Sequence, residues 1–395
     1  MALKSLSTFH DSRYLYTGLL AFTKTSGELP AIELEQRVRK GIEDYAAQQQ
    51  RKYLLAERSP SYQKIPSYII SELTTYGLLE RVDIGGIGFR LTVEGSKMLD
   101  LLSQRRGLVV RTQLAGLYLK TFSRALYFQK RLWELEESGG LRLPEVNYGA
   151  LEPLKLYGTS HLETVINAVG NEIAAQLSSQ FGIKPFKEQF VTKIAHALQN
   201  HKWQAEAKQK SFQATRRAID DFMLPLFFPD FDISRPKYDV LRDRGDTFGL
   251  VNQRRFFGKL ITWEHVYLTA WMEPPMQRPR DMDIDDFLTT KINSTMLWVH
   301  EPEWESFRDK FVRSLNSTWI KRRIPIGYAR IVDLRNDVCL DLRISSKTFD
   351  DFMRNLSREN EFKIAFSSSP ERYTTKAMPL YLDQGKIYNL VRLES

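Results

Sequence analysis

The spacing of apolar residues predicts three helices in the first part of the chain. Residues 13–25 carry the pattern of a compact helix, and a long charged helix is predicted from about Ala31 to Arg58. The sequence Ser59-Pro60-Ser61 interrupts that helix. Apolar residues then recur at helical spacing from Ile65 to Tyr76, and Gly77 suits the left-handed conformation that often ends a helix.

The pattern changes from helix to hairpin between positions 66 and 102, which read PSYIISELTTYGLLERVDIGGIGFRLTVEGSKMLDLL. A strand from Glu80 to Ile84 is expected to pair with a return strand from Phe89 to Leu91, with Gly85-Gly86-Ile87-Gly88 as the tip between them. Thr92 stands where a helix N-cap belongs, before an apolar helix through Leu102. Helix, hairpin and helix therefore follow one another without a long loop.

This order resembles the winged-helix domains of bacterial regulators such as the PadR and MarR families. Those domains commonly show a helix, Gly-Leu-Leu, a strand, a glycine-rich wing, a strand ending in Leu-Thr and an apolar helix. The resemblance is strongest over residues 66–102, and the predicted helices at 13–25 and 31–58 extend it over a winged-helix domain at 1–105. It implies that double-stranded DNA is a partner.

The resemblance also implies which residues touch DNA. The helix before the hairpin would enter the major groove, and the hairpin would contact the flanking phosphates. With the apolar residues facing inward, small polar and basic side chains remain on the outer face. Three acidic residues, Glu72, Glu80 and Asp83, lie near this face. The candidate DNA-binding residues here are Gln63, Lys64, Ser67, Ser71, Thr74, Arg81, Gly86 and Arg90.

Residues 106–230 are expected to form an elongated helical domain. Helices are predicted from Leu108 to Glu137, from Ser160 to Gln180 and from Pro185 to Met223. The last of these would extend roughly 55 Å at about 1.5 Å per residue, so it is either kinked or part of an elongated bundle.

Repeated prolines indicate that residues 231–293 form an irregular or extended connecting region. Within it, only Phe256 to Trp271 has the composition of a strand, and basic and aromatic residues are interleaved there. Such a strand can bind phosphates and stack bases, which makes Arg254, Arg255 and Lys259 further candidate nucleic-acid contacts. An edge strand with its aromatic side chains in the core would show the same pattern.

Residues 294–395 are predicted to form a separate α/β domain. The expected elements are strands at 296–300, 324–334, 338–344 and 362–366 and helices at 303–315 and 346–357. Their order, βαββαβ, is typical of ferredoxin-like folds, and a hairpin from 377–382 to 386–393 follows. The third strand lacks the aromatic residues with which RNA-recognition domains stack bases, which favours protein contact or a purely architectural role. The predicted fold class is α+β.

Composition adds two constraints. The net charge of +9 and the pI of about 9.3 are compatible with a polyanionic partner. The single cysteine, Cys339, expected in the middle of a strand, excludes an internal disulfide and a cysteine-based zinc site. The apolar patch from Leu15 to Phe22 is too short to span a bilayer and does not read as a signal peptide, so a cytoplasmic location without membrane contact is expected.

The sequence carries no recognisable catalytic motif. It contains no Walker-type loop, no His-Glu-x-x-His pair and no Gly-x-Ser-x-Gly elbow. The acidic cluster of Asp281, Asp283, Asp285 and Asp286 is of the type that holds magnesium, but no Asp…Glu-x-Lys pattern follows it. A solvated loop before a helix explains the cluster better. No catalytic residue, metal site or cofactor is therefore predicted.

These features together predict a DNA-binding, non-catalytic subunit of a prokaryotic multiprotein assembly, in genome maintenance or in antiviral defence against mobile elements. A protein partner would bind through the helical or the C-terminal region. Two alternatives stay open. One is a winged-helix transcription regulator that dimerises through residues 108–133, and the other is a metal-dependent DNA-processing enzyme that acts through residues 231–300.

Overall fold

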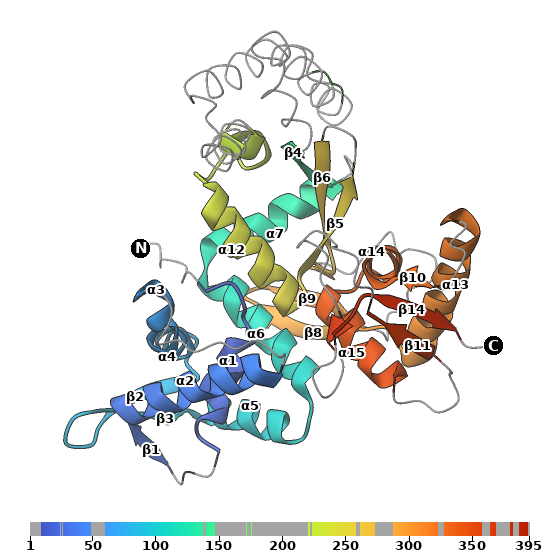
Figure 1. The fold of residues 1–395 in the computed structure, drawn as a ribbon. Helices are drawn as coiled ribbons and strands as arrows, with labels where there is room; N and C mark the ends of the chain where they lie inside the picture. Colours follow the sequence, from blue (N-terminus) through green and yellow to red (C-terminus); the bar gives the residue numbers. More distant parts are fainter. Residues whose placement is uncertain are drawn as a thin grey trace, which may run out of the picture. The chain divides into compact units, whose positions relative to one another are not determined.

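A computed structural model describes residues 9–23, 25, 27–48, 60–136, 140–146, 171, 175, 220–221, 223–257, 261–272, 287–322, 328–357, 364–368, 380–381 and 387–393. Helices and small antiparallel sheets alternate along the chain, which confirms the α+β class (Figure 1). Two units are present. The first comprises Met1–Leu126, Asp243–Asn252 and Thr269–Ser395, and the second comprises Tyr127–Arg242 and Gln253–Leu268. They differ from the four consecutive segments expected from sequence because the chain leaves the first unit and returns to it twice.

The first unit begins with helices packed on a small sheet. The helices are α1 (Tyr14–Leu20), α2 (Ala31–Gln48), α3 (Pro60–Gln63), α4 (Ile65–Thr75) and α5 (Val93–Ser103), and the strands are β1 (Glu28–Pro30), β2 (Leu79–Asp83) and β3 (Ile87–Leu91). The strands lie in the order β1-β3-β2, and both pairings are antiparallel. The expected hairpin is thus confirmed, with Glu80 opposite Arg90 and Arg81 opposite Phe89.

Local residue choices explain where these elements start and stop. Gly77 adopts a φ of +74° directly after α4, a conformation that glycine takes without strain. Thr92 caps α5, because its side chain accepts a hydrogen bond of 3.1 Å from the Gly95 amide. Pro30 is the last residue of β1, and α2 starts at the next residue, Ala31, as predicted.

The prediction of a single helix from Leu108 to Glu137 is wrong. The structure contains two helices there, α6 (Gly107–Thr121) and α7 (Ser123–Glu136), because Phe122 takes an extended conformation between them. The break turns the Phe122 ring into the core, where 5% of the residue is exposed and where it packs on Tyr76 and Tyr118. Tertiary packing therefore outweighs the continuous helical pattern.

The expectation of an irregular segment at 231–293 is also wrong. Helix α12 (Arg235–Phe248) and strands β5 (Val251–Phe257), β6 (Ile261–Leu268), β7 (Ala270–Trp271) and β8 (Phe287–Ile292) lie there. Strand β6 forms the centre of a three-stranded sheet between β5 and β4 (Leu141–Val146). Pro236 lies in the first turn of α12, where a proline does not interrupt the helix. The other prolines of this segment lie outside the described residues.

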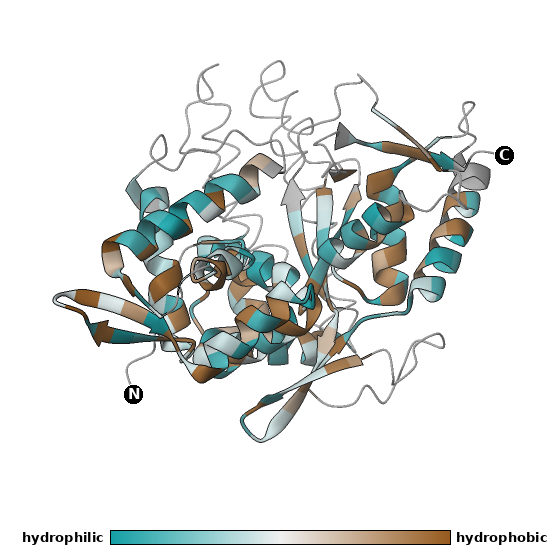
Figure 2. Ribbon diagram, turned by 90° about the horizontal axis from the view of Figure 1, so that it is seen from below, coloured by the Kyte–Doolittle hydropathy of each residue, from teal (hydrophilic) through white to brown (hydrophobic). Residues whose placement is uncertain are grey.

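The C-terminal part of the first unit combines helices with short strands. Strand β9 (Thr295–His300) pairs with β7 and β8, and the helices are α13 (Trp304–Arg322), α14 (Ile331–Leu342) and α15 (Ser346–Leu356). A second sheet has the order β10-β14-β11, formed by Ala329–Arg330, Leu390–Leu393 and Ile364–Ser367, and β12 (Leu380–Tyr381) pairs with β13 (Ile387–Tyr388). Figure 2 shows apolar and polar segments alternating along these helices, as expected for helices that pack by one face.

The ferredoxin-like order predicted for 294–367 is not formed. Residues 331–342 are a helix where parts of two strands were expected, and β9 and β11 belong to different sheets. The buried apolar residues of α14 are Ile331, Leu334, Val338, Cys339 and Leu342. Their spacing is that of one helix face, so the β-branched residues in this segment misdirected the interpretation toward strands. Cys339 accordingly lies buried in a helix.

Several expectations fall outside the residues that the structure describes. The helices expected at 160–180 and 185–223 belong to this group, apart from single helical positions such as Asn171, Ala175 and Asp220. None of the described helices combines the length and the apolar composition that crossing a membrane requires.

Gly95 is a position where a methyl group should be costly. A Cβ there would collide with the carbonyl oxygen of Leu78, which is backbone and cannot move aside easily. We expect Gly95→Ala to destabilise the protein by about 1–3 kcal/mol, although alanine favours helices. Gly107→Ala, also in a first helical turn but with nothing within 4 Å of its Cβ, is the matched control. Denaturant unfolding measures both, and equal stability of the two variants would contradict the expectation.

His300 should make stability depend on pH. Burial lowers its pKa to about 4, and Nδ1 of the neutral ring donates to the Leu342 carbonyl oxygen at 2.5 Å. An unfolded histidine binds its proton near pH 6.5, so stability is lost as the pH falls from about 6.5 toward about 4. At pH 5 the loss should be about 2 kcal/mol, and His300→Gln should remove that part of the pH dependence. An unchanged difference between unfolding at pH 7.5 and at pH 5 would refute this role.

Candidate nucleic-acid interface

Helix α4 presents a small polar face to the solvent. Lys64, Ser67 and Ser71 are exposed, while Gln63 and Thr74 are partly buried. The Ser67 hydroxyl donates to the Lys64 carbonyl oxygen at 2.8 Å, and the Thr74 hydroxyl donates to the Ile70 carbonyl oxygen at 2.8 Å. Each hydroxyl oxygen can still accept a further hydrogen bond. Short side chains of this kind allow the helix backbone to approach a flat or grooved partner closely.

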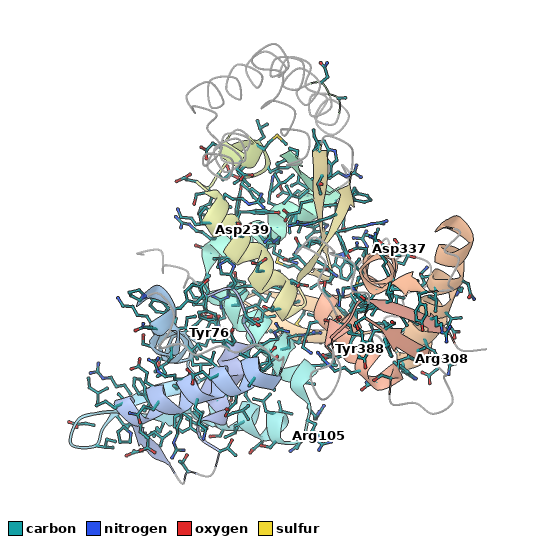
Figure 3. All side chains as sticks on the ribbon, viewed as in Figure 1. Tyr76, Arg105, Asp239, Arg308, Asp337 and Tyr388 are labelled. Carbon is teal, nitrogen blue, oxygen red and sulfur yellow. The ribbon has the colours of Figure 1, made fainter. Side chains whose placement is uncertain are left out.

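Glu72, expected near this face, does not reach it. Its side chain is buried against Arg244 of α12, to which it is bound by an ion pair and by a hydrogen bond of 3.2 Å from Nη1. Tyr76, which is labelled in Figure 3, donates a hydrogen bond of 2.5 Å from its hydroxyl to the same carboxylate. The exposed face of α4 therefore lacks the negative charge of Glu72, while Glu80 and Asp83 lie on the following strand.

Aromatic rings enclose the Arg244 side of this pair. The Cζ atom of Arg244 lies 4.6 Å from the ring centroids of Phe9 and Tyr118 and 5.7 Å from that of Phe248. No part of the Arg244 side chain is exposed. A buried guanidinium needs both a counter-charge and ring contacts to offset its lost hydration. Burial and the negative charge of Glu72 both raise the pKa of Tyr76, so its hydroxyl stays protonated as a donor.

The hairpin that follows α4 ends in an exposed tip. Asp83 Oδ1 accepts hydrogen bonds of 3.2 Å from the amides of Gly85 and Gly86, which holds the turn together. Ile84 and Ile87 flank these glycines and are 37% and 52% exposed. Arg81 of β2 is also exposed. The tip thus offers apolar side chains and bare backbone, with a cation on the neighbouring strand.

Arg90, expected as a phosphate contact, already has two acidic neighbours. It donates to Glu80 through Nε at 2.6 Å, and its Nη1 lies 3.5 Å from Glu28. The three residues occupy facing positions on β2, β3 and β1. The hydrogen bond and the charge of Glu80 raise the pKa of Arg90. This surface of the sheet is therefore not a site of excess positive charge.

The second predicted group of basic residues belongs to the other unit. Arg254 and Arg255 lie on β5 and are partly buried, and Lys259 lies outside the described residues. The guanidinium of Arg254 sits 4.6 Å from the ring centroid of Phe256, which stacks on His265 at 6.1 Å. Both arginines already take part in interactions, and they belong to the second unit, whereas α4 belongs to the first.

Glu264, on the neighbouring strand β6, is the carboxylate that pairs with two other arginines of this region. It accepts hydrogen bonds from Arg242 at 2.7 Å, from Arg235 at 3.1 Å and from the Tyr238 hydroxyl at 3.1 Å. Burial opposes ionisation of Glu264, but the charges of Arg242 and Arg235 lower its pKa to about 2. The buried cluster is thus an internal ion network in which the carboxylate is already satisfied.

Three features of the protein bear on catalysis, namely possible metal-binding groups, the acidic cluster and the single cysteine. Among the described residues, no group of three or more His, Cys, Asp or Glu side chains is placed to hold a metal ion. The acidic cluster at 281–286 lies outside those residues. Burial raises the pKa of Cys339, which opposes formation of a reactive thiolate.

Comparison of the chain with protein-family models, with curated proteins and with solved structures found no match. The functional interpretation therefore depends on the residues and the geometry described above.

Sequence reasoning missed the pairing of Glu72 with Arg244. A signal for one half of it exists, because Glu72 follows Ile69 by three positions and precedes Tyr76 by four, which places it on the apolar stripe of α4. A carboxylate on such a stripe needs a buried partner. No pattern in the sequence identifies Arg244 as that partner, since 172 positions separate the two residues.

Removing the charge of Glu72 should be far more costly than breaking an exposed pair. Glu72→Gln keeps the side-chain shape but leaves the Arg244 cation buried without its counter-charge, and we expect a loss of about 3–5 kcal/mol. Glu94→Gln, which breaks the exposed pair with Lys97, should cost at most about 1 kcal/mol. Urea unfolding of both variants measures the difference. A Glu72→Gln variant as stable as Glu94→Gln would show that the buried pair does not hold α4 in place.

Proposed function

We propose that this protein is a DNA-binding, non-catalytic subunit of a multiprotein assembly, and that residues of α4 and the β2–β3 hairpin contact duplex DNA. The observation that carries the proposal is the arrangement of an exposed, small-residue helix face directly before an exposed hairpin. In this proposal α1, β1, α2, α4, β2 and β3 form a winged helix, with α4 as the recognition helix.

The geometry suits a groove with a charged backbone on either side. A helix fits the major groove of B-DNA, and the following hairpin can then reach the adjacent phosphates. Lys64 stands at the N-terminal end of α4, where the helix dipole also favours negative charge. Arg81 supplies a cation on the hairpin. Withdrawal of Glu72 into the core removes one source of repulsion from the phosphates.

Arg90 is left out of the proposed contacts, unlike in the sequence-based prediction. Its two glutamate neighbours neutralise it, and a phosphate would have to compete with both. Ile84 and Ile87 at the tip are better suited to apolar contact with a sugar or a base edge.

The role of subunit in an assembly is supported by the chain beyond α5. This part is larger than the proposed winged helix and has a core of its own around Phe307, Phe311 and Phe349. The sequence shows no catalytic motif that would occupy it. A protein-binding role in a prokaryotic assembly for genome maintenance or mobile-element defence follows by analogy of architecture alone.

The DNA contact can be tested by reversing two charges. Lys64→Glu with Arg81→Glu should weaken binding to a duplex with 5′-hydroxyl ends by at least tenfold, or about 1.4 kcal/mol, near 100 mM salt. The fold should survive, because both residues are exposed and an acidic residue at a helix N-terminus is favourable. Fluorescence anisotropy measures the affinity, and its slope against salt concentration should become shallower.

The matched control is Lys120→Glu with Lys291→Glu, which changes the net charge equally at exposed positions on α6 and β8. This variant should bind within about threefold of the wild type. Equal losses in both variants, or a wild type that does not bind duplex, would reject the proposal and favour a protein-binding role for the winged helix.

A further inference from the structure

The first unit contains a pocket of about 260 Å³ that is rich in cations. It lies where α1, the turn before α6, the last turn of α12 and α15 meet. Four of its lining side chains are basic, namely Arg13, Arg105, Arg111 and Lys347. Arg105 is labelled in Figure 3 and lies at the turn between α5 and α6. These residues come from three distant parts of the sequence.

One carboxylate, Asp351, also lines the pocket, but the carboxylates in and around it do not pair with all four basic side chains. Arg13 forms a bidentate pair with Asp11, with distances of 2.7 and 2.5 Å. Lys347 pairs with Asp351, but Asp351 also accepts a hydrogen bond of 2.5 Å from Arg354 and so serves two cations. Arg105 is exposed, and no carboxylate among the described residues pairs with it. The pocket therefore has positive charge to offer an anion.

Arg111 is held rigidly at the wall of the pocket. It is 3% exposed, and it donates to Glu301 and to the Thr348 hydroxyl at 3.1 Å each. Its Nε has no hydrogen-bond partner. A Cβ on Gly249 would lie 3.2 Å from Arg111 Cζ, so the backbone there packs directly against the guanidinium. A cation fixed in advance loses little side-chain entropy when a ligand binds.

The start of α6 adds hydrogen-bond donors on the same wall. Gly107 and Leu108 begin this 15-residue helix and line the pocket. The N-cap residue, Arg106, makes no side-chain capping bond, and the first turn contains no acidic residue. The first amides of the helix are thus available to an anion, and the helix dipole favours negative charge there. Burial raises the pKa of the nearby Tyr16 to about 12, which keeps its hydroxyl protonated.

We propose that this pocket binds a phosphate monoester, the dianionic group carried by a free nucleotide or by the 5′ end of a DNA strand. Convergent cations with fixed geometry, together with helix amides, are the donor set that suits the three terminal oxygens of such a group. The volume is slightly below the roughly 300–1,000 Å³ of pockets for drug-sized ligands, which favours a small ligand such as a nucleoside monophosphate.

This site is separate from the DNA contact proposed for α4 and the hairpin. A bound phosphate would connect α1, which packs on α4, with α15 of the C-terminal part. The two proposals can fail independently, because a duplex with 5′-hydroxyl ends tests the α4 surface without offering a monoester.

Calorimetry in phosphate-free buffer at constant ionic strength tests the site. Adenosine 5′-monophosphate should bind at least tenfold more tightly than adenosine, and inorganic phosphate should compete with it. Arg105→Glu should weaken binding of the monophosphate at least tenfold. Arg313→Glu is the matched control, because it makes the same charge change at an exposed residue of α13. It should keep the affinity within about threefold, because Arg313 neither lines the pocket nor belongs to an element that forms it.

A second measurement distinguishes the sources of the monoester. If duplex with 5′-phosphate ends binds more tightly than duplex with 5′-hydroxyl ends, and Arg105→Glu abolishes that preference, the phosphate belongs to a DNA end. If the free monophosphate binds and the ends make no difference, the ligand is a small molecule. The proposal is overturned if the wild type prefers no phosphate-bearing probe to its phosphate-free counterpart, or if Arg313→Glu loses as much affinity as Arg105→Glu.

Discussion

The buried ion pair between Glu72 and Arg244 is the constraint on which the first unit depends. It joins α4, near the N-terminus, to the last turns of α12, and both side chains are almost completely buried. A pair of this kind is costly to desolvate and tolerable only when every neighbouring group supports it. The Tyr76 hydroxyl and the rings of Phe9 and Tyr118 do so here. The orientation of α4 is therefore set by residues far from it in sequence.

The same pair shapes the proposed interface. By drawing Glu72 inward, it leaves Lys64, Ser67 and Ser71 as the exposed face of α4 without a neighbouring carboxylate on that helix surface. Phe122 contributes as well, because the break between α6 and α7 allows its ring to pack on Tyr76. The core of the unit and the proposed interface thus depend on the same packing arrangement.

Many of the charged side chains that the structure describes are arranged in ion pairs. Arg90 and Arg254 were expected to face nucleic acid, yet one is held by two glutamates and the other lies over an aromatic ring. Arg105 shows the opposite behaviour, since no carboxylate among the described residues pairs with it and it lines a pocket with three further basic side chains. A count of basic residues along the sequence cannot separate these cases, because pairing depends on which side chains meet in space.

The sequence by itself determined the elements whose signals are local. The apolar stripe from Ile65 to Tyr76, the glycine tip and the Thr92 cap specify α4, the hairpin and the start of α5 within 40 residues of one another, because helix and strand periodicity and capping act over a few residues. Only the tertiary structure decided that Phe122 divides α6 from α7 and that Arg244 meets Glu72. Those outcomes arise from contacts between residues far apart in the chain, and the energies of such contacts exceed local propensities that amount to less than about 1 kcal/mol per residue.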